Sequence, residues 1–362
     1  MTQQQQQQHH ELITVIIPVY NAEPFLRQAL ASIVGQSYRN LEILCLNDGS
    51  TDGSAAILAE FARQDERIRI IDKPNEGYGA TCNRGLAEAR GSWIAVLEPD
   101  DWIEGPMFER MIAFASTLDT MPDIVKSPYW RIVSPDTNQE QRLPCAYAGT
   151  FRVRKQPFSV DKAPHLLDSH PSIWSALYRK EFLDRCGIRF KEYPGAGWAD
   201  NPFLIETLCQ TTKIAYIDQA FYCYREDTPE KTAEFTRRFP ERPLQRWNEM
   251  RDILDRLDAG GNPIIVEAHN RRGVFYVDVI LREIEAPDEH LSSAIASTLR
   301  RMEPNLVLAD PYLPADLRRL YARYAGLPEP RINKGCDRFK LALLDMRRRG
   351  IVATVRALTH RR

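Results

Sequence analysis

The strongest constraint on the fold is an alternation, over residues 12–116, of short apolar runs with segments of helical periodicity. The runs LITVIIPV at 12–19 and LEILCL at 41–46 are almost continuously apolar, as is typical of strands buried on both faces. The same order recurs along this region, with further strands expected at 68–71 and 93–97 and helices at 24–34, 50–64, 79–90 and 106–116. This alternation predicts an α/β fold with a mostly parallel sheet flanked by helices.

The rest of the chain is less regular and then becomes helical. We expect a strand at 123–133, a loop or hairpin at 138–154, a helix at 178–186 ended by Gly187, a helix at 201–209 and strands within 213–225. From about residue 230 the pattern is helical, with breaks at 260–263 (GGNP) and in the proline-rich stretch 311–330. Residues 1–11, MTQQQQQQHHE, are low in complexity and are expected to form a disordered tail.

Charge and cysteine usage argue against several classes of protein. The chain has 48 Lys and Arg against 49 Asp and Glu, so its net charge of -1 gives no support to nucleic-acid binding. Its seven cysteines are odd in number and form no C-x-x-C pair, which is typical of reduced thiols in a cytoplasmic protein. No apolar run reaches the roughly 18 residues of a membrane span, and we expect no spanning helix.

Polar clusters follow three of the expected strands. They are Pro18-Val19-Tyr20-Asn21, Asn47 to Asp52 (NDGSTD) and Glu98-Pro99-Asp100-Asp101. Ligands of open parallel sheets bind beyond the carboxyl ends of the strands, and so these clusters are expected to meet at one edge. Carboxylates from separate strands suit Mg²⁺ or Mn²⁺, which commonly shares its coordination with phosphate oxygens. Such a cation neutralises the charge of a departing diphosphate.

Four motifs, in this order, resemble the donor half of family 2 glycosyltransferases of the GT-A fold: IIPVYN, LNDGSTD, GYGATCNRG and LEPDDW. The resemblance is close over residues 12–105 and loose over 170–226. It implies a GT-A domain at 12–228, with a donor-nucleotide half at 12–105 and an acceptor half at 106–228. A helical C-terminal region would follow at 229–330, and then a basic tail at 331–362.

The resemblance also implies how the donor is held. Tyr20 and Asp48 would bind the base and ribose, because a carboxylate at a strand end can accept hydrogen bonds from a uracil N–H or from ribose hydroxyls. The DGSTD segment is equally good turn and capping chemistry, so a structural role for Asp48 stays open. The implied donor-binding residues are Pro18, Tyr20, Asn21, Asp48, Asn83, Asp100 and Arg225.

The EPDD segment stands where the family has its DXD motif. The resemblance implies that Asp101 binds the cation, with Glu98 and Asp227 as further ligands. The family often has Asp at the position of Glu98, and a His or basic residue near that of Asp227. A purely acidic loop is the alternative, although adjacent acids repel each other when no cation lies between them.

In the second half, the segment Gly197-Trp198-Ala199-Asp200 resembles the place of the family's general base. Asp200 would take the proton of an acceptor hydroxyl as that oxygen attacks the anomeric carbon. The family usually has an acidic pair, and Ala199 departs from it; Cys82 likewise stands where Arg is usual. A helix-capping role for Asp200 is the alternative.

The last 32 residues are strongly basic, with ten Lys and Arg against two Asp. Apolar residues at 339–344 and 351–358 are interspersed among them. Two interpretations stay open. The tail either forms an amphipathic helix on an anionic membrane surface or packs its apolar face on the protein and solvates its arginines.

Together these features predict an inverting glycosyltransferase that moves a sugar from a nucleotide-diphosphate sugar, a UDP-sugar by preference, to a hydroxyl of a glycan or lipid-linked acceptor. It would be cytoplasmic, with peripheral contact at the inner membrane face left open, and would serve cell-envelope or surface polysaccharide synthesis. A non-catalytic binder of sugar nucleotides is one alternative, suggested by Ala199, Cys82 and Glu98. A nucleotidyltransferase is the other, although YNAEPF replaces the glycine-rich basic loop expected after its first strand.

Overall fold

A computed structural model describes residues 11–151, 153–226 and 228–349. These form two compact units. The first, here called the α/β unit, comprises residues 11–148, 153–159 and 171–226; the second, the helical unit, comprises 149–151, 160–170 and 228–349. Segment 160–170 therefore groups with the helical unit, although it lies inside the domain expected at 12–228.

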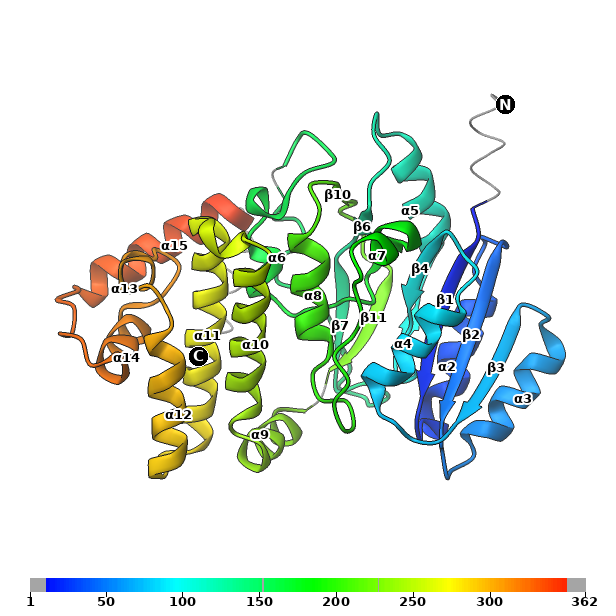
Figure 1. Ribbon diagram of the computed structural model, residues 1–362, viewed down its shortest axis with the longest axis horizontal. Helices are drawn as coiled ribbons and strands as arrows, with labels where there is room; N and C mark the ends of the chain where they lie inside the picture. Colours follow the sequence, from blue (N-terminus) through cyan, green and yellow to red (C-terminus); the bar gives the residue numbers. More distant parts are fainter. Residues whose placement is uncertain (1–10, 152, 227, 350–362) are drawn as a thin grey trace. The chain divides into compact units, whose positions relative to one another are not determined.

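A seven-stranded sheet with the order β10-β6-β9-β4-β1-β2-β3 forms the centre of the α/β unit (Figure 1). Strands β1 (Ile13–Val19), β2 (Leu41–Asp48), β3 (Ile68–Lys73) and β4 (Trp93–Val96) are parallel to one another. Every residue of β1 and β2 is buried, as their continuous apolar runs require. The prediction of a mostly parallel sheet flanked by helices is confirmed.

The helices of this region bury apolar stripes of helical spacing. Helix α2 (Glu23–Val34) buries Leu26, Ala29, Leu30 and Ile33. The connections between the parallel strands also include α3 (Ser54–Gln64) and α4 (Tyr78–Glu88), and α5 (Met107–Ser116) follows β4. Each crossover returns the chain to the same edge of the sheet, so the loops after β1, β2 and β4 meet there.

The single strand expected at 123–133 is wrong, because the structure has two strands in different sheets. Strand β6 (Ile124–Lys126) joins the large sheet, and β7 (Tyr129–Val133) joins a four-stranded sheet with the order β5-β11-β7-β8. Pro128 lies between them and has no backbone N–H for a ladder, so the chain turns there. The small sheet is completed by β5 (Trp102–Ile103), β8 (Gln141–Pro144) and β11 (Tyr222–Glu226).

The helix expected at 178–186 begins later than its periodicity suggests. Residues Ala176–Arg179 form strand β9, which pairs antiparallel with both β4 and β6, and α7 covers Lys180–Arg185. Two strand partners override the local helical preference of this segment. Gly187, with φ of +63°, follows α7 as expected. Helix α8 (Asp200–Cys209) and strand β10 (Ile214–Tyr216) complete the unit.

The helical unit packs around a core that includes Trp247, Val274, Ile295 and Tyr321. The proline-rich stretch 311–330, expected as a break, contains helix α14 (Ala315–Ala325), because Pro314 precedes the helix where proline is tolerated. No helix among the described residues has the length and apolarity to cross a bilayer. The elements of the helical unit are η1 (Val160–Lys162), α6 (His165–Asp168), α9 (Pro229–Arg238), α10 (Arg242–Arg256), η2 (Ala259–Gly261), α11 (Pro263–Glu283), α12 (Glu289–Arg300), α13 (Pro304–Ala309), α14 and α15 (Lys334–Arg349).

Candidate functional site

A cavity of about 330 Å³ lies where the loops after β1, β2 and β4 meet. Three acidic side chains line it, those of Asp48, Glu98 and Asp100, and its lining includes neither Lys nor Arg. We call it the carboxyl-edge cavity. Six predicted donor or metal residues belong to its lining. The lining residues are Pro18, Val19, Tyr20, Asn21, Ala22, Phe25, Asp48, Asn75, Gly77, Tyr78, Thr81, Glu98, Pro99, Asp100, Gly195 and Ala196.

The loops after β1 and β2 are fastened to each other by hydrogen bonds. The side-chain oxygen of Asn21 accepts from the backbone N–H of Thr51 at 2.8 Å. Asp52 accepts from the backbone N–H groups of Glu23 and Ser54, both at 3.0 Å, and so stabilises the first turns of two helices. Asn21 has φ of +49°, a conformation that Asn tolerates better than most residues. This part of the cavity wall is therefore fixed before any ligand binds.

Asp48 shapes the next loop as well as lining the cavity. Its side chain is almost fully buried and accepts hydrogen bonds from the backbone N–H groups of Glu76 and Gly77, both at 3.0 Å. Lys73 forms a short ion pair with the same carboxylate. The two open interpretations of Asp48 are thus compatible: it organises the turn before α4, and it faces the cavity.

Glu98 is paired with Tyr78, which the sequence analysis did not single out. The Tyr78 hydroxyl donates to Oε1 of Glu98 at 2.6 Å. Burial raises the pKa of Glu98 to about 8; the Tyr78 hydrogen bond opposes this rise, and the charges of Asp100 and Asp200 add to it. Tyr78 begins α4 immediately after Gly77, and this position beside a glycine-rich turn is the signal that could have identified it.

Asp100 and Asp101, although adjacent, have different surroundings. Asp100 is exposed and lines the cavity, whereas Asp101 is 2% exposed and is absent from its lining. Asp101 accepts hydrogen bonds from the Tyr222 hydroxyl at 2.9 Å and from the backbone N–H of Arg225 at 2.7 Å. Burial and the charge of Asp100 raise the pKa of Asp101 well above its usual range. Asp101 therefore joins the loop after β4 to strand β11.

Asn83 and Arg225, both predicted to bind the donor, are also absent from the cavity lining. Asn83 is hydrogen-bonded to the backbone of Phe190. Arg225 lies between the rings of Phe25 and Trp102, with its guanidinium carbon 5.1 and 4.9 Å from their centroids. Both contacts are internal to the α/β unit. The predicted metal ligand Asp227 lies outside the described residues.

Asp200, the predicted general base, is the first residue of α8 and is half-buried. Asn201 donates a side-chain hydrogen bond to it at 3.1 Å. Asp200 does not itself line the cavity, but Gly195 and Ala196, shortly before it in the chain, do. Its charge contributes to the raised pKa of Glu98, which places the two carboxylates in the same electrostatic neighbourhood.

The residues of this cavity fit a divalent cation that completes its coordination with other oxygens. No group of three or more His, Cys, Asp or Glu residues with metal-binding geometry occurs within the described ranges. Two carboxylates, Glu98 and Asp100, nevertheless line the cavity together. Mg²⁺ sites of this kind use one or two carboxylates, and water and substrate phosphates supply the remaining ligands.

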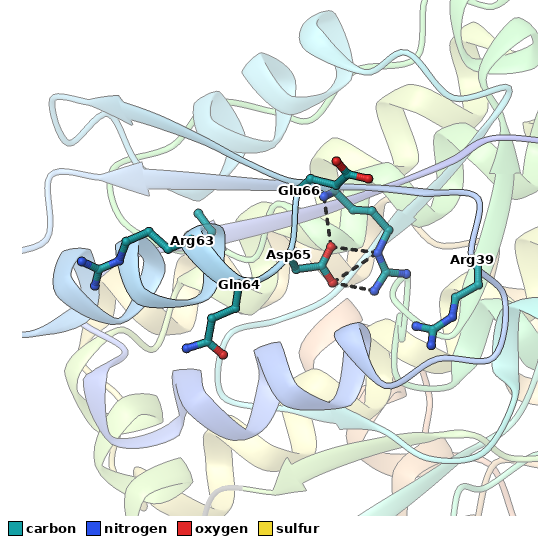
Figure 2. A pocket seen from close by; sticks show the side chains of 7 residues that line it. Arg39, Arg63, Gln64, Asp65 and Glu66 are labelled. Carbon is teal, nitrogen blue, oxygen red and sulfur yellow. Dashed lines mark hydrogen bonds and ion pairs between the residues drawn. The ribbon is translucent and has the colours of Figure 1, made fainter.

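A larger cavity, of about 590 Å³, lies at the opposite edge of the sheet, before β2 and β3 begin (Figure 2). We call it the amino-edge cavity. Within it, Arg67 is paired with Asp65, with Nη2 2.6 Å from Oδ2 and Nε 2.9 Å from Oδ1. The lining residues are Arg39, Ala62, Arg63, Gln64, Asp65, Glu66 and Arg67.

Comparison with known proteins agrees with the fold. Residues 14–187 match the model of glycosyl transferase family 2. The glycosyltransferase GlyG of Streptococcus pneumoniae is 34% identical over 229 residues, which is 59% of this chain and 71% of GlyG. The uncharacterized glycosyltransferase EpsJ of Bacillus subtilis is 28% identical over 218 residues, 60% of this chain and 61% of EpsJ. The chain thus spans less than two thirds of EpsJ.

The chain belongs to glycosyl transferase family 2, as the resemblance implied. The crystal structure of Staphylococcus aureus TarS 1–349 superposes with a TM-score of 0.67 at 18% identity, covering 94% of this chain and 92% of that one. The predicted GT-A type of fold is confirmed by this likeness.

Proposed function

We propose that this protein transfers a sugar from a nucleotide-diphosphate sugar to a hydroxyl acceptor, with the donor in the carboxyl-edge cavity. One observation carries the proposal: three carboxylates from the ends of β2 and β4 line a cavity whose lining includes no Lys or Arg. Although Asp48 is paired with Lys73 and burial raises the pKa of Glu98 to about 8, the lining offers a bare diphosphate no cationic side chain. A diphosphate that arrives with a divalent cation would be attracted, because the cation offsets both sets of charges.

The donor nucleotide is proposed to be UDP. Tyr20, 52% exposed, offers an aromatic face for a base, and Asp48 at the cavity wall offers acceptor oxygens to base or ribose. TarS, which shares the fold, has been crystallised with UDP and with UDP-GlcNAc.

We assign the cation, Mg²⁺ or Mn²⁺, to Asp100 and Glu98 in preference to Asp101. Asp100 is exposed and lines the cavity, whereas Asp101 is 2% exposed and is absent from the lining. Another neighbour in fold, the mannosyltransferase PcManGT of Pyrobaculum calidifontis with a TM-score of 0.51, has been solved with GDP-Man and Mn²⁺. When bound, the cation would neutralise charge on the leaving diphosphate.

Asp200 is proposed to activate the acceptor. Its carboxylate would take the proton of the acceptor hydroxyl while that oxygen forms a bond to the anomeric carbon and the bond from this carbon to the diphosphate breaks. Both electrons of the broken bond leave with the nucleoside diphosphate. A single displacement of this kind inverts the anomeric centre.

The acceptor class is proposed from relatives of this chain. GgaB of Bacillus subtilis, a minor teichoic acid biosynthesis protein, is 30% identical over 215 residues, which is 23% of GgaB. We therefore propose a glycan or lipid-linked acceptor in the synthesis of a cell-envelope polymer.

We also propose that α15 makes peripheral contact with an anionic membrane. Asp337 is buried and accepts from the backbone N–H of Ala315 at 2.7 Å, which fixes one side of α15 to α14. Phe339 is 65% exposed, and its neighbours Arg338 and Lys340 are exposed as well. An exposed aromatic ring between cations suits the interface of an anionic bilayer. The part of the basic tail at 350–362 lies outside the described residues.

The test is a screen of UDP-, GDP- and dTDP-sugars for thermal stabilisation with Mn²⁺ and with EDTA. A ligand that binds the folded state alone raises its apparent stability, and we expect UDP-sugars to do so only when Mn²⁺ is present. Asp100→Asn should abolish this stabilisation, while Asp101→Asn should lower the melting temperature of the free protein and retain the Mn²⁺-dependent response. Absence of any response in the wild type would refute the proposal. Binding with no turnover, across donors and acceptors, would support the non-catalytic alternative.

A further inference from the structure

The loop at residues 190–198 connects the two halves of the proposed reaction. Two of its residues, Gly195 and Ala196, line the carboxyl-edge cavity, and Asp200 follows two residues after its end. We call it the bridging loop. A shift in this loop would displace a wall of the donor cavity and the proposed base together.

The bridging loop has a conformation that requires support from outside. Gly195, Gly197 and Trp198 have φ values of +66°, +58° and +59°. For Trp198, which has a bulky side chain, this region of φ is strained. Such strain persists only where surrounding contacts over-determine the backbone.

Helix α4 supplies part of this support, through Asn83 and Tyr78. The Asn83 Nδ2 donates to the carbonyl of Phe190 at 3.0 Å and to Oε1 of Glu192 at 2.9 Å. Its Oδ1 accepts from the backbone N–H of Phe190 at 2.8 Å. At the other end of the loop, the backbone N–H of Tyr78 donates to the carbonyl of Gly195 at 3.0 Å. Asn83 thus holds both polar groups of one backbone residue, as a neighbouring strand would.

Two glycines of the same region allow this close approach. A methyl group at Gly79 would overlap the carbonyl of Lys191. One at Gly77, which also has φ of +88°, would lie 2.6 Å from the carbonyl oxygen of Tyr193. The start of α4 and the bridging loop are therefore in backbone contact along several residues, and Asn83 adds the side-chain hydrogen bonds.

We propose that Asn83 is a positioning residue, which acts through the bridging loop on Asp200 and on the Gly195–Ala196 wall and does not contact the donor. The proposal rests on the proposed function and differs from the donor-binding role that the sequence implied for Asn83. Loss of the Asn83 contacts would leave the nucleotide end of the cavity, at Tyr20 and Asp48, intact. It would release the base, so that acceptor activation suffers more than nucleotide binding.

The test compares Asn83→Ala and Asn83→Asp with Arg84→Ala as a matched control. Arg84 is the next residue of the same helix, and its side chain is 55% exposed and paired with Glu88. Three quantities are measured for each variant: the affinity for UDP with Mn²⁺, kcat for transfer relative to donor hydrolysis, and hydrogen exchange of amides 190–198. Asn83→Asp keeps an acceptor for the Phe190 N–H and loses the N–H donors, so its kcat and its rate of hydrogen exchange should lie between those of wild type and Asn83→Ala.

For Asn83→Ala we expect UDP affinity within about twofold of wild type, a roughly 10- to 100-fold lower kcat for transfer with a higher share of hydrolysis, and faster exchange across the loop. Arg84→Ala should resemble wild type in all three. The proposal is overturned if UDP affinity falls while exchange of the loop is unchanged, because Asn83 would then contact the donor. Unchanged kcat and exchange would overturn it as well. Exchange is read without substrate, so it tests the loop contacts even if the proposed reaction is refuted.

Discussion

The two cavities at opposite edges of the large sheet differ in size, charge and origin. The amino-edge cavity is the larger, yet six of its seven lining residues are consecutive, 62–67, and Arg67 is paired with an acid two residues away. The carboxyl-edge cavity gathers side chains from β1, β2, α4, the loop after β4 and the bridging loop. A local turn explains the first cavity. The second exists because parallel strands deliver distant segments to one edge.

The charges of the two cavities sharpen this contrast. The lining at the amino edge includes three arginines, Arg39, Arg63 and Arg67, and two acids, Asp65 and Glu66, so the signs nearly balance within the cavity. At the carboxyl edge the lining is acidic, and Lys73 pairs with Asp48 from outside the lining. This acidic lining is the feature to explain, and the cation and diphosphate that we propose would account for it. Cavity volume alone would point to the amino edge, whereas our proposal places the ligands at the carboxyl edge.

The largest expected effect belongs to Asp200, the proposed base. Asp200→Asn should lower kcat for transfer by roughly 10²- to 10⁴-fold, because the amide cannot accept the acceptor proton. UDP affinity should stay within about twofold, since Asp200 does not line the cavity. Steady-state kinetics with parallel calorimetry would check both values. A variant that transfers at the wild-type rate would remove Asp200 from the mechanism.

A matched pair of acids compares the two edges directly. Asp48→Asn should weaken Mn²⁺-dependent UDP binding by about 10- to 100-fold, as expected when a charged hydrogen-bonding group is lost. Asp65→Asn, at the amino edge, should leave binding unchanged and lower stability modestly through loss of its pairing with Arg67. Calorimetric titration of both variants provides the measurement. Equal losses would show that the two edges are not functionally distinct.

Lys126 is a buried ionisable residue that lines neither cavity. A change there should affect the stability of the fold and not the binding of UDP. Its Nζ donates to the carbonyl of Ser172 at 2.9 Å and to Ser172 Oγ at 3.1 Å, beside Ser175 and the Tyr147 ring. Burial lowers the pKa of Lys126 to about 7, and Cys145 opposes this slightly. The unfolded chain therefore binds more protons between pH 7 and 10.5, and stability from this group rises with pH across that window.

The pH dependence of stability in the wild type is compared with that of Lys126→Met, which lacks the titrating ammonium group. From pH 7 to 9 the unfolding free energy of the wild type should increase relative to that of the variant, by at most about 1.4 kcal/mol per pH unit. Denaturant unfolding at several pH values gives both curves. Parallel curves would mean that the lysine is not titrating in this range, and UDP affinity should be alike in the two proteins.

The smallest expected effect concerns the helical unit. Phe339→Glu should weaken binding to phosphatidylcholine vesicles containing phosphatidylglycerol about fivefold or more, since an apolar contact is replaced by a repelled charge. Phe275→Glu is the control, because Phe275 is also exposed, at 39%, but lies on α11. Co-sedimentation at low and high salt provides the measurement. Equal vesicle binding by both variants would show that Phe339 of α15 does not contact the membrane.

The sequence predicts the parallel half of the fold because the apolar composition of β1 to β4 indicates that these strands are buried. It does not predict local structure that depends on a partner far along the chain. Strand β9 has a helical pattern and becomes a strand because β4 and β6 pair with it. Asn83 was recognisable as a motif residue, but its contact with Phe190 joins positions 107 apart.

The same limit explains the acidic segment after β4. The motif identifies Asp100 and Asp101 together, but they belong to a turn closed by a hydrogen bond from the Asp101 N–H to the Glu98 carbonyl, so their sequence alone does not tell which of them faces the cavity. Which of them faces the cavity depends on Tyr222 and on the backbone of Arg225, both supplied by β11. Tyr78 escaped notice for a similar reason, since its partner Glu98 is 20 residues away.

The central claim is that the diphosphate and its cation occupy the carboxyl edge, and methyl NMR with Mn²⁺ tests it most directly. Paramagnetic Mn²⁺ broadens nearby signals, and alanine methyls occur in both cavities: Ala22 and Ala196 at the carboxyl edge, Ala62 at the amino edge. With UDP and substoichiometric Mn²⁺, the account predicts broadening of Ala22 and Ala196 and a sharp Ala62, with the effect lost in Asp100→Asn. Selective broadening of Ala62, or an Asp100→Asn spectrum identical to that of the wild type, would contradict it.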